Sequence, residues 1–411
     1  MTGRALAVLN PQCAAEFALR GKDLLHADLI GASTMADQTD FCSIPKDQTI
    51  YYEALGIVLI GGQLKQPETL LDSAGNTLFG KCYDDMTVPA PAPERSRRRS
   101  RSSVPLRAAT ATAAAVASCW ADSPQLTWGV QATGAHASSR DGSGIRVAIL
   151  DSGIDLEHEA FRGLPPPRLR SFVAARANFD HNGHGTHCAG TICGGWAPGG
   201  QRYGIAPRVE LFVAKIFDDR LRSCDARTLA ALNWAVMNQC DIVSMSVGGQ
   251  VPLNSPHSPI FEAAAKAALQ KNTLLIAGAG NDSSRAGSNF MPVNHPANCP
   301  SIVSVGAIDE CRIVSDSSNR GLNAHGGKVD FVAPGMRVLS ALAGGGIAPM
   351  DGTSMATPFV TGIAALWAQT DSSLRGQKLW DALKPHALKM RDLDPAGNAK
   401  DYGEGLPQAP P

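Results

Sequence analysis

The sequence has no excess of charge of either sign, few aromatic residues and no long apolar run. Its 411 residues contain 37 Lys and Arg against 37 Asp and Glu, so the formal net charge is +0. A neutral chain has no overall field to draw it onto nucleic acid or an anionic membrane surface. The apolar stretches around Leu274–Ala279 and Ile363–Ala368 are far shorter than the roughly 20 residues that cross a bilayer. We therefore expect a soluble protein with no membrane or nucleic-acid partner.

Two marks of secreted proteins are also missing. The apolar residues at the N-terminus end at Asn10-Pro11, too early for a secretory signal. The 10 cysteines have no metal-finger spacing and, in a chain of this length, do not indicate a disulfide framework. We expect mostly reduced thiols and a cytoplasmic location. An even number of cysteines still permits a few bridges, and export by another route stays open.

The chain does have the length and the apolar content, 44%, for one large domain and a smaller one. Composition changes sharply between residues 86 and 118, where Pro89, Pro91 and Pro93 precede arginines among serines and then an Ala/Thr run. Such a stretch buries too little apolar surface to offset its ordering entropy. It predicts a disordered linker, residues 86–118, between an N-terminal module, residues 1–85, and a domain at residues 119–411. The arginines have three interpretations: part of a solvated linker, a processing site for another protease, or a contact with nucleic acid or an anionic surface.

The two parts differ in their hydrophobic patterns. Residues 1–85 predict a small α+β module with a strand at Ala5–Leu9, strand structure in Ile50–Ile60 and a helix at Ala14–Leu25. Residues 119–411 alternate short apolar runs with helical stretches, which predicts an α/β domain with a parallel sheet and helices on both faces. Its expected strands are Ile145–Leu150, Val209–Ile216, Ile242–Ser246, Leu274–Ala277 and Ile302–Val305. Its expected helices are Thr186–Cys193, Ala226–Asn238, Ile260–Lys271 and Ser354–Gln369.

Three polar side chains stand where such a fold places its ligands, beyond the carboxyl ends of strands or at the start of helices. Asp151 ends a buried strand, His184 begins a helix among small residues, and Ser354 begins an apolar helix. Each has an ordinary alternative by itself: a turn carboxylate, a metal ligand paired with His187, or a helix cap. No third ligand follows the two histidines at a zinc-protease spacing. Only the three segments taken together decide between a functional and an ordinary role for these residues.

The segments Asp151-Ser152-Gly153, His184-Gly185-Thr186-His187 and Gly352-Thr353-Ser354-Met355-Ala356 together resemble the motifs of the subtilisin-like serine proteases, in the chain order Asp, His, Ser. The resemblance covers roughly Trp120 to the C-terminus. It implies a three-layer α/β fold with a mostly parallel sheet flanked by helices, preceded here by the α+β module. Cys188, one helical turn after His184, is similar to the cysteine of the proteinase K-like branch.

The resemblance also implies the roles of particular residues. Ser354 is expected to be the nucleophile, His184 its general base, and Asp151 the group that orients His184. Asn281, after a buried strand, takes the place of the oxyanion-hole asparagine. The substrate would be bound by Ser246, Val247 and Gly248, by Gly278 and Ala279 on the opposite wall, and by an edge strand of Leu221, Arg222 and Ser223. The Gly- and Pro-rich stretch between Gly194 and Tyr203 lacks the family's Asn-rich calcium loop, so we expect no metal and no cofactor.

These observations predict a serine endopeptidase that cleaves peptides or proteins and is made as a zymogen. The N-terminal module is expected to act as an intramolecular inhibitor or chaperone and to be removed by self-processing. One alternative is a peptide-tailoring protease or macrocyclase, in which an incoming amine resolves the acyl-enzyme. A second is a pseudoprotease that binds peptides without cutting them, and the intact set of Asp151, His184, Asn281 and Ser354 argues against it.

Overall fold

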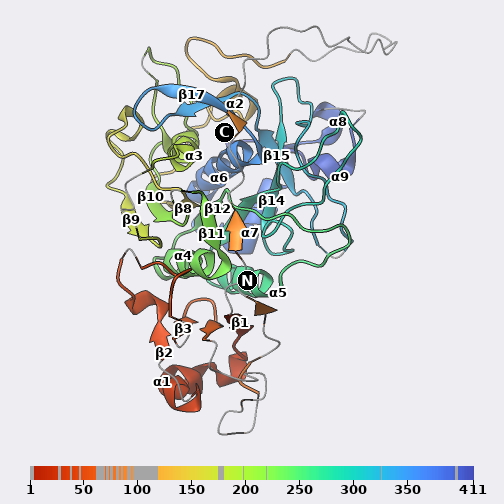
Figure 1. The fold of residues 1–411 in the computed structure, drawn as a ribbon. Helices are drawn as coiled ribbons and strands as arrows, with labels where there is room; N and C mark the ends of the chain where they lie inside the picture. Colours follow the sequence, from red (N-terminus) through yellow and green to blue (C-terminus); the bar gives the residue numbers. More distant parts are fainter. Residues whose placement is uncertain are drawn as a thin grey trace.

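The structure is a computed structural model, and Figure 1 shows a small N-terminal part below a larger α/β part. It describes residues 4–25, 29–37, 39–45, 48–61, 70, 74, 77–79, 83–84, 87–89, 94–95, 119–174, 180–197, 199–218, 220–324, 326–393 and 397–411. Among these residues no helix has both the length and the apolar character that a membrane span requires.

The N-terminal part is a five-stranded sheet with one long helix, α1 (Ala14–Leu25). Its strand order is β2-β3-β4-β1-β5, and the strands are β1 (Ala5–Val8), β2 (Leu29–Gly31), β3 (Thr49–Tyr52), β4 (Ile57–Ile60) and β5 (Tyr83–Asp84). Short 3₁₀ helices, η1 (Pro11–Cys13) and η2 (Ala32–Thr34), follow β1 and β2. A turn at residues 53–56 divides the expected strand structure of Ile50–Ile60 into β3 and β4.

Alternate residues of this sheet face different neighbours, as the period of two in a strand requires. Ala7 and Val58 belong to the core that includes Phe17 of α1. Leu6 and Leu59 belong instead to the core of the larger part. The sheet therefore lies between its own helix and the larger part, whose helices α4 and α5 lie directly above it in Figure 1.

The larger part contains a seven-stranded parallel sheet in the order β15-β14-β13-β12-β8-β10-β9. Its strands are β8 (Arg146–Asp151), β9 (Arg168–Ser171), β10 (Glu210–Lys215), β12 (Ile242–Met245), β13 (Leu274–Gly278), β14 (Val303–Ile308) and β15 (Phe331–Pro334). Five of these seven strands were expected, and the two that the sequence did not reveal, β9 and β15, are the edges of the sheet.

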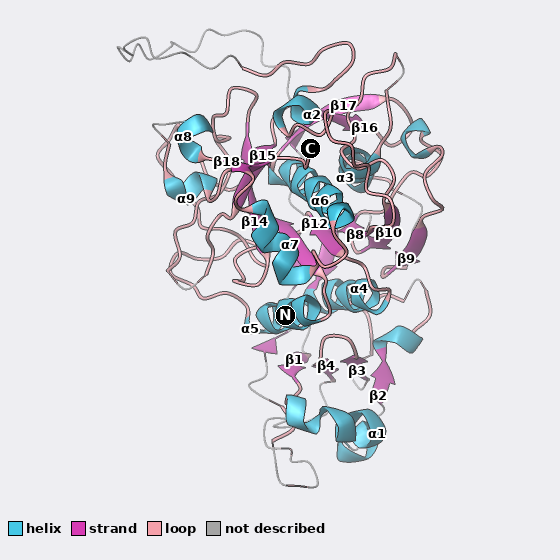
Figure 2. Cartoon of the chain, turned by 180° about the vertical axis from the view of Figure 1, so that it is seen from behind, coloured by secondary structure: helices cyan, strands magenta, loops and turns pink. Residues whose placement is uncertain are grey.

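Helices flank this sheet, as expected (Figure 2). α3 (His184–Cys193) packs against α6 (Thr353–Thr370), and α4 (Asp225–Met237) lies beside α5 (Pro259–Gln270). Smaller elements complete the domain: α2 (Trp128–Ala132), η4 (Glu159–Phe161), β11 (Arg222–Cys224), β16 (Val338–Ala341), β17 (Ile347–Asp351), α7 (Gly376–Leu383), β18 (Ala387–Leu388), α8 (Met390–Leu393), α9 (Ala399–Tyr402) and β19 (Leu406–Pro407).

Part of the expected disordered linker forms strands. β6 (Thr87–Pro89) pairs antiparallel with β11, and β7 (Glu94–Arg95) pairs antiparallel with β17. The expectation of disorder is therefore wrong for these five residues, because an exposed strand edge offers backbone partners that do not depend on apolar side chains. The other residues of 86–118 lie outside the described residues, and the proposed domain boundaries stay a prediction.

Cysteine pairing differs in part from the expectation of mostly reduced thiols. Disulfides join Cys42 to Cys224 and Cys119 to Cys311. Four of the other described cysteines are free and buried: Cys188, Cys193, Cys240 and Cys299. The paired cysteines are 182 and 192 residues apart in the sequence, so no local spacing pattern indicates either bridge.

Candidate active site

Asp151 lies at the carboxyl end of β8, where a parallel sheet presents its ligands. Its side chain is fully buried, and the Ser152 backbone N–H donates to its Oδ1 at 2.7 Å. Lys215 stands opposite Asp151 on the neighbouring strand β10. The buried Lys215 ammonium donates to the Ser152 carbonyl, which fixes the turn that follows Asp151.

His184 is the first residue of α3 and is brought to Asp151 by the turn before this helix. Gly183, which precedes it, has a φ of +87°, a conformation that favours glycine. His184 Nδ1–H donates to Asp151 Oδ1 at 2.8 Å, and Oδ2 lies 3.1 Å away. Two residues 33 positions apart in the chain thus form one buried pair.

Asp180, which the sequence analysis did not single out, holds the start of α3 in place. Its Oδ1 accepts from Ser152 Oγ at 2.9 Å, and its Oδ2 accepts from the Thr186 backbone N–H at 2.8 Å. Ser152 Oγ in turn accepts from the Gly185 backbone N–H at 2.9 Å. These bonds satisfy N–H groups that have no partner within the helix, and they join the end of β8 to α3. Asp180 is therefore a positioning residue for the Asp151–His184 pair.

The proton affinity of His184 is set by two opposing effects. Burial lowers the pKa of His184, but the Asp151 carboxylate raises it, and the net result lies well above 6.5. The other ring nitrogen, Nε2, is buried and has no hydrogen-bond partner among the described residues. The side chain therefore presents one nitrogen that is ready to accept a proton from a neighbouring group.

His187 differs from His184 although it lies on the same helix. Its Nε2–H donates to the carbonyl oxygens of Val338 on β16 and Ala348 on β17, each at 3.0 Å. Burial lowers its pKa to about 4, so His187 is neutral near neutral pH. It links α3 to the β16–β17 hairpin and is a packed core residue, not a metal ligand.

Ser354 is the second residue of α6, the helix that packs against α3. Gly352, at the N-cap position, has a φ of +136°, which turns the chain from β17 into the helix. The Ser354 carbonyl accepts from Ser246 Oγ at 3.1 Å and from Cys188 Sγ at 3.5 Å. Cys188 Sγ also lies 3.9 Å from His184 Nδ1, so Cys188 touches both His184 and Ser354.

Asn281 follows β13 and contacts the same helix start. Its Oδ1 accepts from the Thr353 backbone N–H at 2.8 Å. Because the amide oxygen is engaged in this way, the two N–H groups on Nδ2 point elsewhere. A Cβ on Gly352 would lie 3.1 Å from Nδ2, which places these donors next to the turn that leads into Ser354.

The two expected walls of the substrate pocket lie on either side of Asn294. Ser246, Val247 and Gly248 continue from β12, and a Cβ on Gly248 would lie 3.5 Å from the Asn294 Cβ. Opposite them, the Ala279 carbonyl accepts from the Asn294 backbone N–H at 2.9 Å. Asn294 Nδ2 then donates to Asp282 Oδ2 at 2.7 Å, so a polar side chain that the sequence did not reveal is held beside both segments.

The expected edge strand of Leu221, Arg222 and Ser223 includes the first part of β11. Leu221 has a φ of +57°, and the Arg222 guanidinium donates to Asp218 Oδ2 at 2.9 Å. Arg222 is thus an exposed member of a local ion pair. The backbone of this strand is paired with β6, where Pro89 lies opposite Arg222 and Val88 opposite Ser223. A segment of the protein's own chain therefore occupies the edge that the sequence analysis assigned to substrate.

The chain is similar to known proteins over the part that contains these residues. The model of the Subtilase family matches residues 142–405, a range that contains every candidate residue named above. The chain belongs to the subtilase family. This subtilase is 31% identical to Subtilisin E of Bacillus subtilis (strain 168) over 282 residues, which are 67% of this chain and 68% of that protein. It is 34% identical to Subtilisin Savinase of Lederbergia lenta over 291 residues, 69% of this chain and 97% of that protein.

A solved structure gives a third comparison. The chain matches the structure titled "Structure of Prenylagaramide maturation protease PagA" with a TM-score of 0.57 and 29% sequence identity, over 67% of this chain and 95% of that one. The fold and the enzyme class expected from the sequence are thereby confirmed. This subtilase is a serine endopeptidase that acts on peptide or protein substrates.

Among the described residues, the ligand atoms of Asp151, His184 and Cys188 lie within 4.8 Å of one another, which is close enough to hold a metal ion. Their present bonding does not fit that use. His184 Nδ1 carries the proton that it donates to Asp151, and burial raises the pKa of the Cys188 thiol, so Cys188 is protonated. A resident metal at this position would have to displace both protons.

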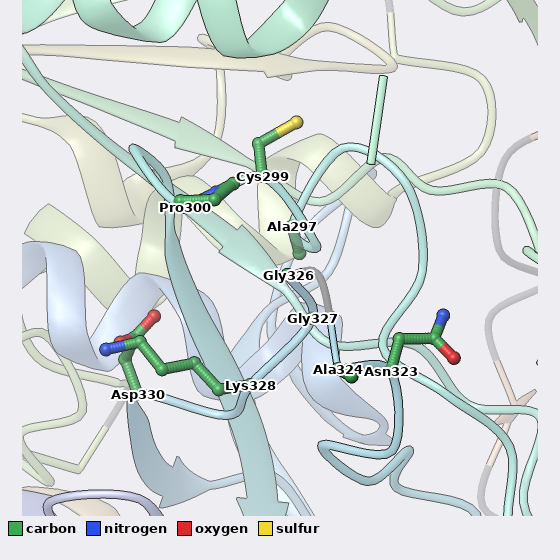
Figure 3. A pocket seen from close by; sticks show the side chains of 9 residues that line it. All are labelled: Ala297, Cys299, Pro300, Asn323, Ala324, Gly326, Gly327, Lys328 and Asp330. Carbon is green, nitrogen blue, oxygen red and sulfur yellow. The ribbon is translucent and has the colours of Figure 1, made fainter. Parts of the chain in front are cut away.

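Figure 3 shows a pocket elsewhere in the subtilase, with a cavity volume of about 270 Å³. Its lining residues are Ala297, Cys299, Pro300, Asn323, Ala324, Gly326, Gly327, Lys328 and Asp330. At one side Lys328 Nζ lies 2.8 Å from Asp330 Oδ1, and the Ser304 backbone N–H donates to Asp330 Oδ2. These bonds pair its charged groups within the fold, and none of its lining residues belongs to the candidate active site.

Proposed function

We propose that this subtilase cleaves peptide bonds through an acyl-enzyme on Ser354, with His184 as general base and Asp151 as its orienting carboxylate. The observation that carries the proposal is the buried Asp151–His184 pair, which leaves His184 Nε2 unpartnered at the start of the helix pair α3 and α6. In the first step His184 Nε2 accepts the proton of Ser354 Oγ, and that oxygen attacks the substrate carbonyl carbon.

The second part of the proposal concerns the charge that develops on the carbonyl oxygen. Ser354 lies in the first turn of α6, where backbone N–H groups have no partner within the helix. The Asn281 Nδ2 donors lie beside the same turn because Oδ1 is held by Thr353. We assign the Ser354 backbone N–H and an Asn281 Nδ2–H as the donors to the oxyanion. Their hydrogen bonds stabilise this oxygen most in the tetrahedral state, where its negative charge is greatest. His184 then returns the proton to the leaving amine, and water repeats the sequence to release the acyl group.

The proposal extends to self-processing and inhibition by the N-terminal module. An extended peptide is expected to bind as a strand against β11, with its side chains between Gly248 and Ala279. The pairing of β6 with β11 supports inhibition, because β6 and a substrate peptide would compete for the same backbone groups of β11. The stretch from about Arg101 to Asp122 follows β6 and β7 in the chain, and it is where we expect the enzyme to cut itself.

A second candidate function is peptide tailoring, in which the acyl-enzyme transfers its peptide to an amine. The observation that favours it is the likeness to PagA, whose title names it a maturation protease. The two functions differ only in the group that resolves the acyl-enzyme. Mass spectrometry of the products from one peptide, with and without an added amine nucleophile, tells hydrolysis from transfer by their masses.

The nucleophile can be identified by labelling. A fluorophosphonate probe reacts with an activated serine, and we expect the modified tryptic peptide to carry the label on Ser354. The Ser354→Ala variant should not be labelled, whereas Ser373→Ala, which changes an exposed serine of the same domain, should be labelled like the wild type. Labelling of folded Ser354→Ala to the wild-type extent would contradict the proposal.

The cytoplasmic location expected from the sequence stays a prediction. The disulfides Cys42–Cys224 and Cys119–Cys311 weigh against it, because cytosolic thiols are kept reduced. Acid quenching of producing cells, alkylation of free thiols and mass spectrometry of the four cysteine peptides would decide the question. Alkylated cysteines in freshly quenched cells would support a reducing compartment, and intact bridges would contradict it.

A further inference from the structure

The N-terminal module is joined to the catalytic domain by a covalent bond besides the linker. Cys42 of the module is bonded to Cys224, the last residue of β11. α4 begins at the next residue, Asp225. The disulfide therefore fastens the module to the end of the strand whose backbone, under the proposed function, binds substrate.

Polar contacts surround this disulfide on both sides. The Asp40 carboxylate pairs with the buried Arg227 guanidinium of α4. The Tyr52 hydroxyl donates to the Ala226 carbonyl at 3.0 Å, and Asn233 Oδ1 accepts from the Ala54 backbone N–H at 2.7 Å. The Cys42–Cys224 disulfide thus lies within an interface that holds the module on α4.

The interface also has an apolar component. Ile50, Tyr52, Ile57 and Leu59 are buried in the same core cluster as the residues of α4 and α5. Burial of such side chains removes apolar surface from water and stabilises the contact. The module is therefore held by packing and by a covalent bond, and cleavage of the linker removes neither.

The linker strands belong to the same retained unit. Both β6 and β7 precede Arg101, where the stretch of the proposed cut begins, so after that cut they remain connected to the module. A proline flanks every peptide bond from Pro89 to Glu94, the stretch between the two strands. Proline lacks the backbone N–H and fixes φ, which makes these bonds poor substrates. The strand on β11 is therefore expected to survive linker cleavage.

We propose that Cys42–Cys224 makes the N-terminal module a covalently retained inhibitor, which is released only when a dithiol reduces this disulfide after the linker has been cut. The proposal rests on the proposed function for the meaning of inhibition, but not for retention of the module. A tether of this kind turns dissociation into an intramolecular equilibrium, and it strengthens apparent binding by about 10²–10⁴-fold.

The redox step is an ordinary thiol–disulfide exchange with a Cys-x-x-Cys type dithiol. Cys224 is buried and Cys42 is half-buried, so the reductant thiolate attacks Cys42 Sγ. The bond between the two sulfurs breaks, and Cys224 leaves as a thiolate that takes up a proton. The second thiol of the reductant then attacks the mixed disulfide, which leaves Cys42 as a thiol and the reductant as a disulfide. Two electrons and two protons pass from the reductant to the protein.

Retention is tested in the Ser354→Ala chain, which keeps the question apart from catalysis. Limited trypsin treatment cuts the linker at its arginines, and the product is run on gels and by size exclusion with and without dithiothreitol. We expect one covalent species on a non-reducing gel and two fragments on a reducing gel. Two fragments on the non-reducing gel would overturn the proposal.

Inhibition is tested with the wild-type chain nicked in the same way. We expect hydrolysis of a peptide ester to rise about 10²-fold or more on addition of dithiothreitol. Nicked Cys42→Ser should be active without reductant, and Cys119→Ser, which removes the Cys119–Cys311 bridge, should respond like the wild type. If Cys42→Ser does not fold, nicked Cys119→Ser before and after reduction decides the question, because it keeps the Cys42–Cys224 bridge and lacks Cys119–Cys311.

The outcomes separate the two proposals. Full activity of the nicked, oxidised wild type would overturn the tethered inhibitor while leaving the proposed function intact. An equal response of Cys42→Ser to reductant would overturn it as well, because the effect would then come from another bond. No activity under any condition, with one covalent species still present on the non-reducing gel, would contradict the proposed function and leave retention of the module established.

Discussion

The Thr353 backbone N–H donates to Asn281 Oδ1 at 2.8 Å, so the residue immediately before Ser354 sets the orientation of the Asn281 amide. An amide flipped by 180° would place Nδ2 against this N–H and lose the bond. The start of α6 thus holds in place a side chain from the end of β13, and the Nδ2 donors are directed by the backbone.

Replacement of Asn281 by Ala or Leu should lower kcat far more than it changes KM. The donor is assigned to an oxygen that is strongly charged only in the tetrahedral state, and loss of the corresponding donor in subtilisin costs roughly 10²–10³ in kcat. Steady-state kinetics on a peptide ester would measure the effect. A higher KM with an unchanged kcat would show instead that Asn281 binds the ground state.

The pH dependence of kcat/KM should report the raised pKa of His184. His184 acts as a base only when Nε2 is unprotonated, so activity is lost as the pH falls through its pKa, and the acid limb should have its midpoint above pH 6.5. In Asp151→Asn burial is no longer opposed by a carboxylate, so the midpoint should move to lower pH while the plateau falls.

The second histidine of α3, His187, does not interfere with this measurement. His187 has a pKa of about 4 and therefore contributes no ionisation in the same range. A midpoint that stays in place in Asp151→Asn would show that the limb belongs to another group than His184.

Gly248→Val should discriminate between substrates by the size of the side chain at P1. A Cβ at this position would lie 3.2 Å from the His295 carbonyl oxygen and 3.5 Å from the Asn294 Cβ, so the valine methyls would narrow the space between the walls. We expect kcat/KM for a Phe substrate to fall at least about 10-fold more than for an Ala substrate. Gly287→Val, on an exposed turn, is the matched control. Equal losses of kcat/KM on both substrates would argue against Gly248 as a wall of the P1 pocket.

The wild-type chain should cut itself between about Arg101 and Asp122, and Ser354→Ala should stay at full length. Small residues dominate this stretch and fit most P1 pockets, and it precedes the catalytic domain. N-terminal sequencing of both chains, made in the same host without added protease, would measure the result. Cleavage of both would implicate a host protease, and persistence of both would mean that the N-terminal module is a permanent domain.

The central strands of the sheet could be predicted from the sequence, whereas its edges could not. The five central strands, β8, β10, β12, β13 and β14, are buried on both faces, so each is mostly apolar. β9 is an edge strand of four residues, and two of them are arginines, Arg168 and Arg170. β15 is apolar, but it is equally short and ends at Pro334. Arginines within a short strand and a proline at its end both weaken the strand signal in the sequence.

The site could be predicted where it depends on local motifs and not where it depends on distant contacts. Asp151, His184 and Ser354 stand in recognisable segments, and the structure brings the first two into contact. In the sequence Asp180 is only an acidic residue just before a helix, which is a weak indication of a helix start. Its bond to Ser152 depends on where β8 ends relative to α3. Pairing of β6 with β11 and the Cys42–Cys224 bond depend on tertiary placement alone.

Turnover by a folded Ser354→Ala protein is the most direct test of the account, whose central claim is that this oxygen forms the acyl-enzyme. The chain should be nicked and reduced, its fold should be checked by its thermal unfolding, and hydrolysis of a peptide ester should be measured beside the wild type. We expect kcat to fall about 10⁶-fold, the loss known for removal of the nucleophile in subtilisin. Turnover at the wild-type rate by the folded variant would contradict the account.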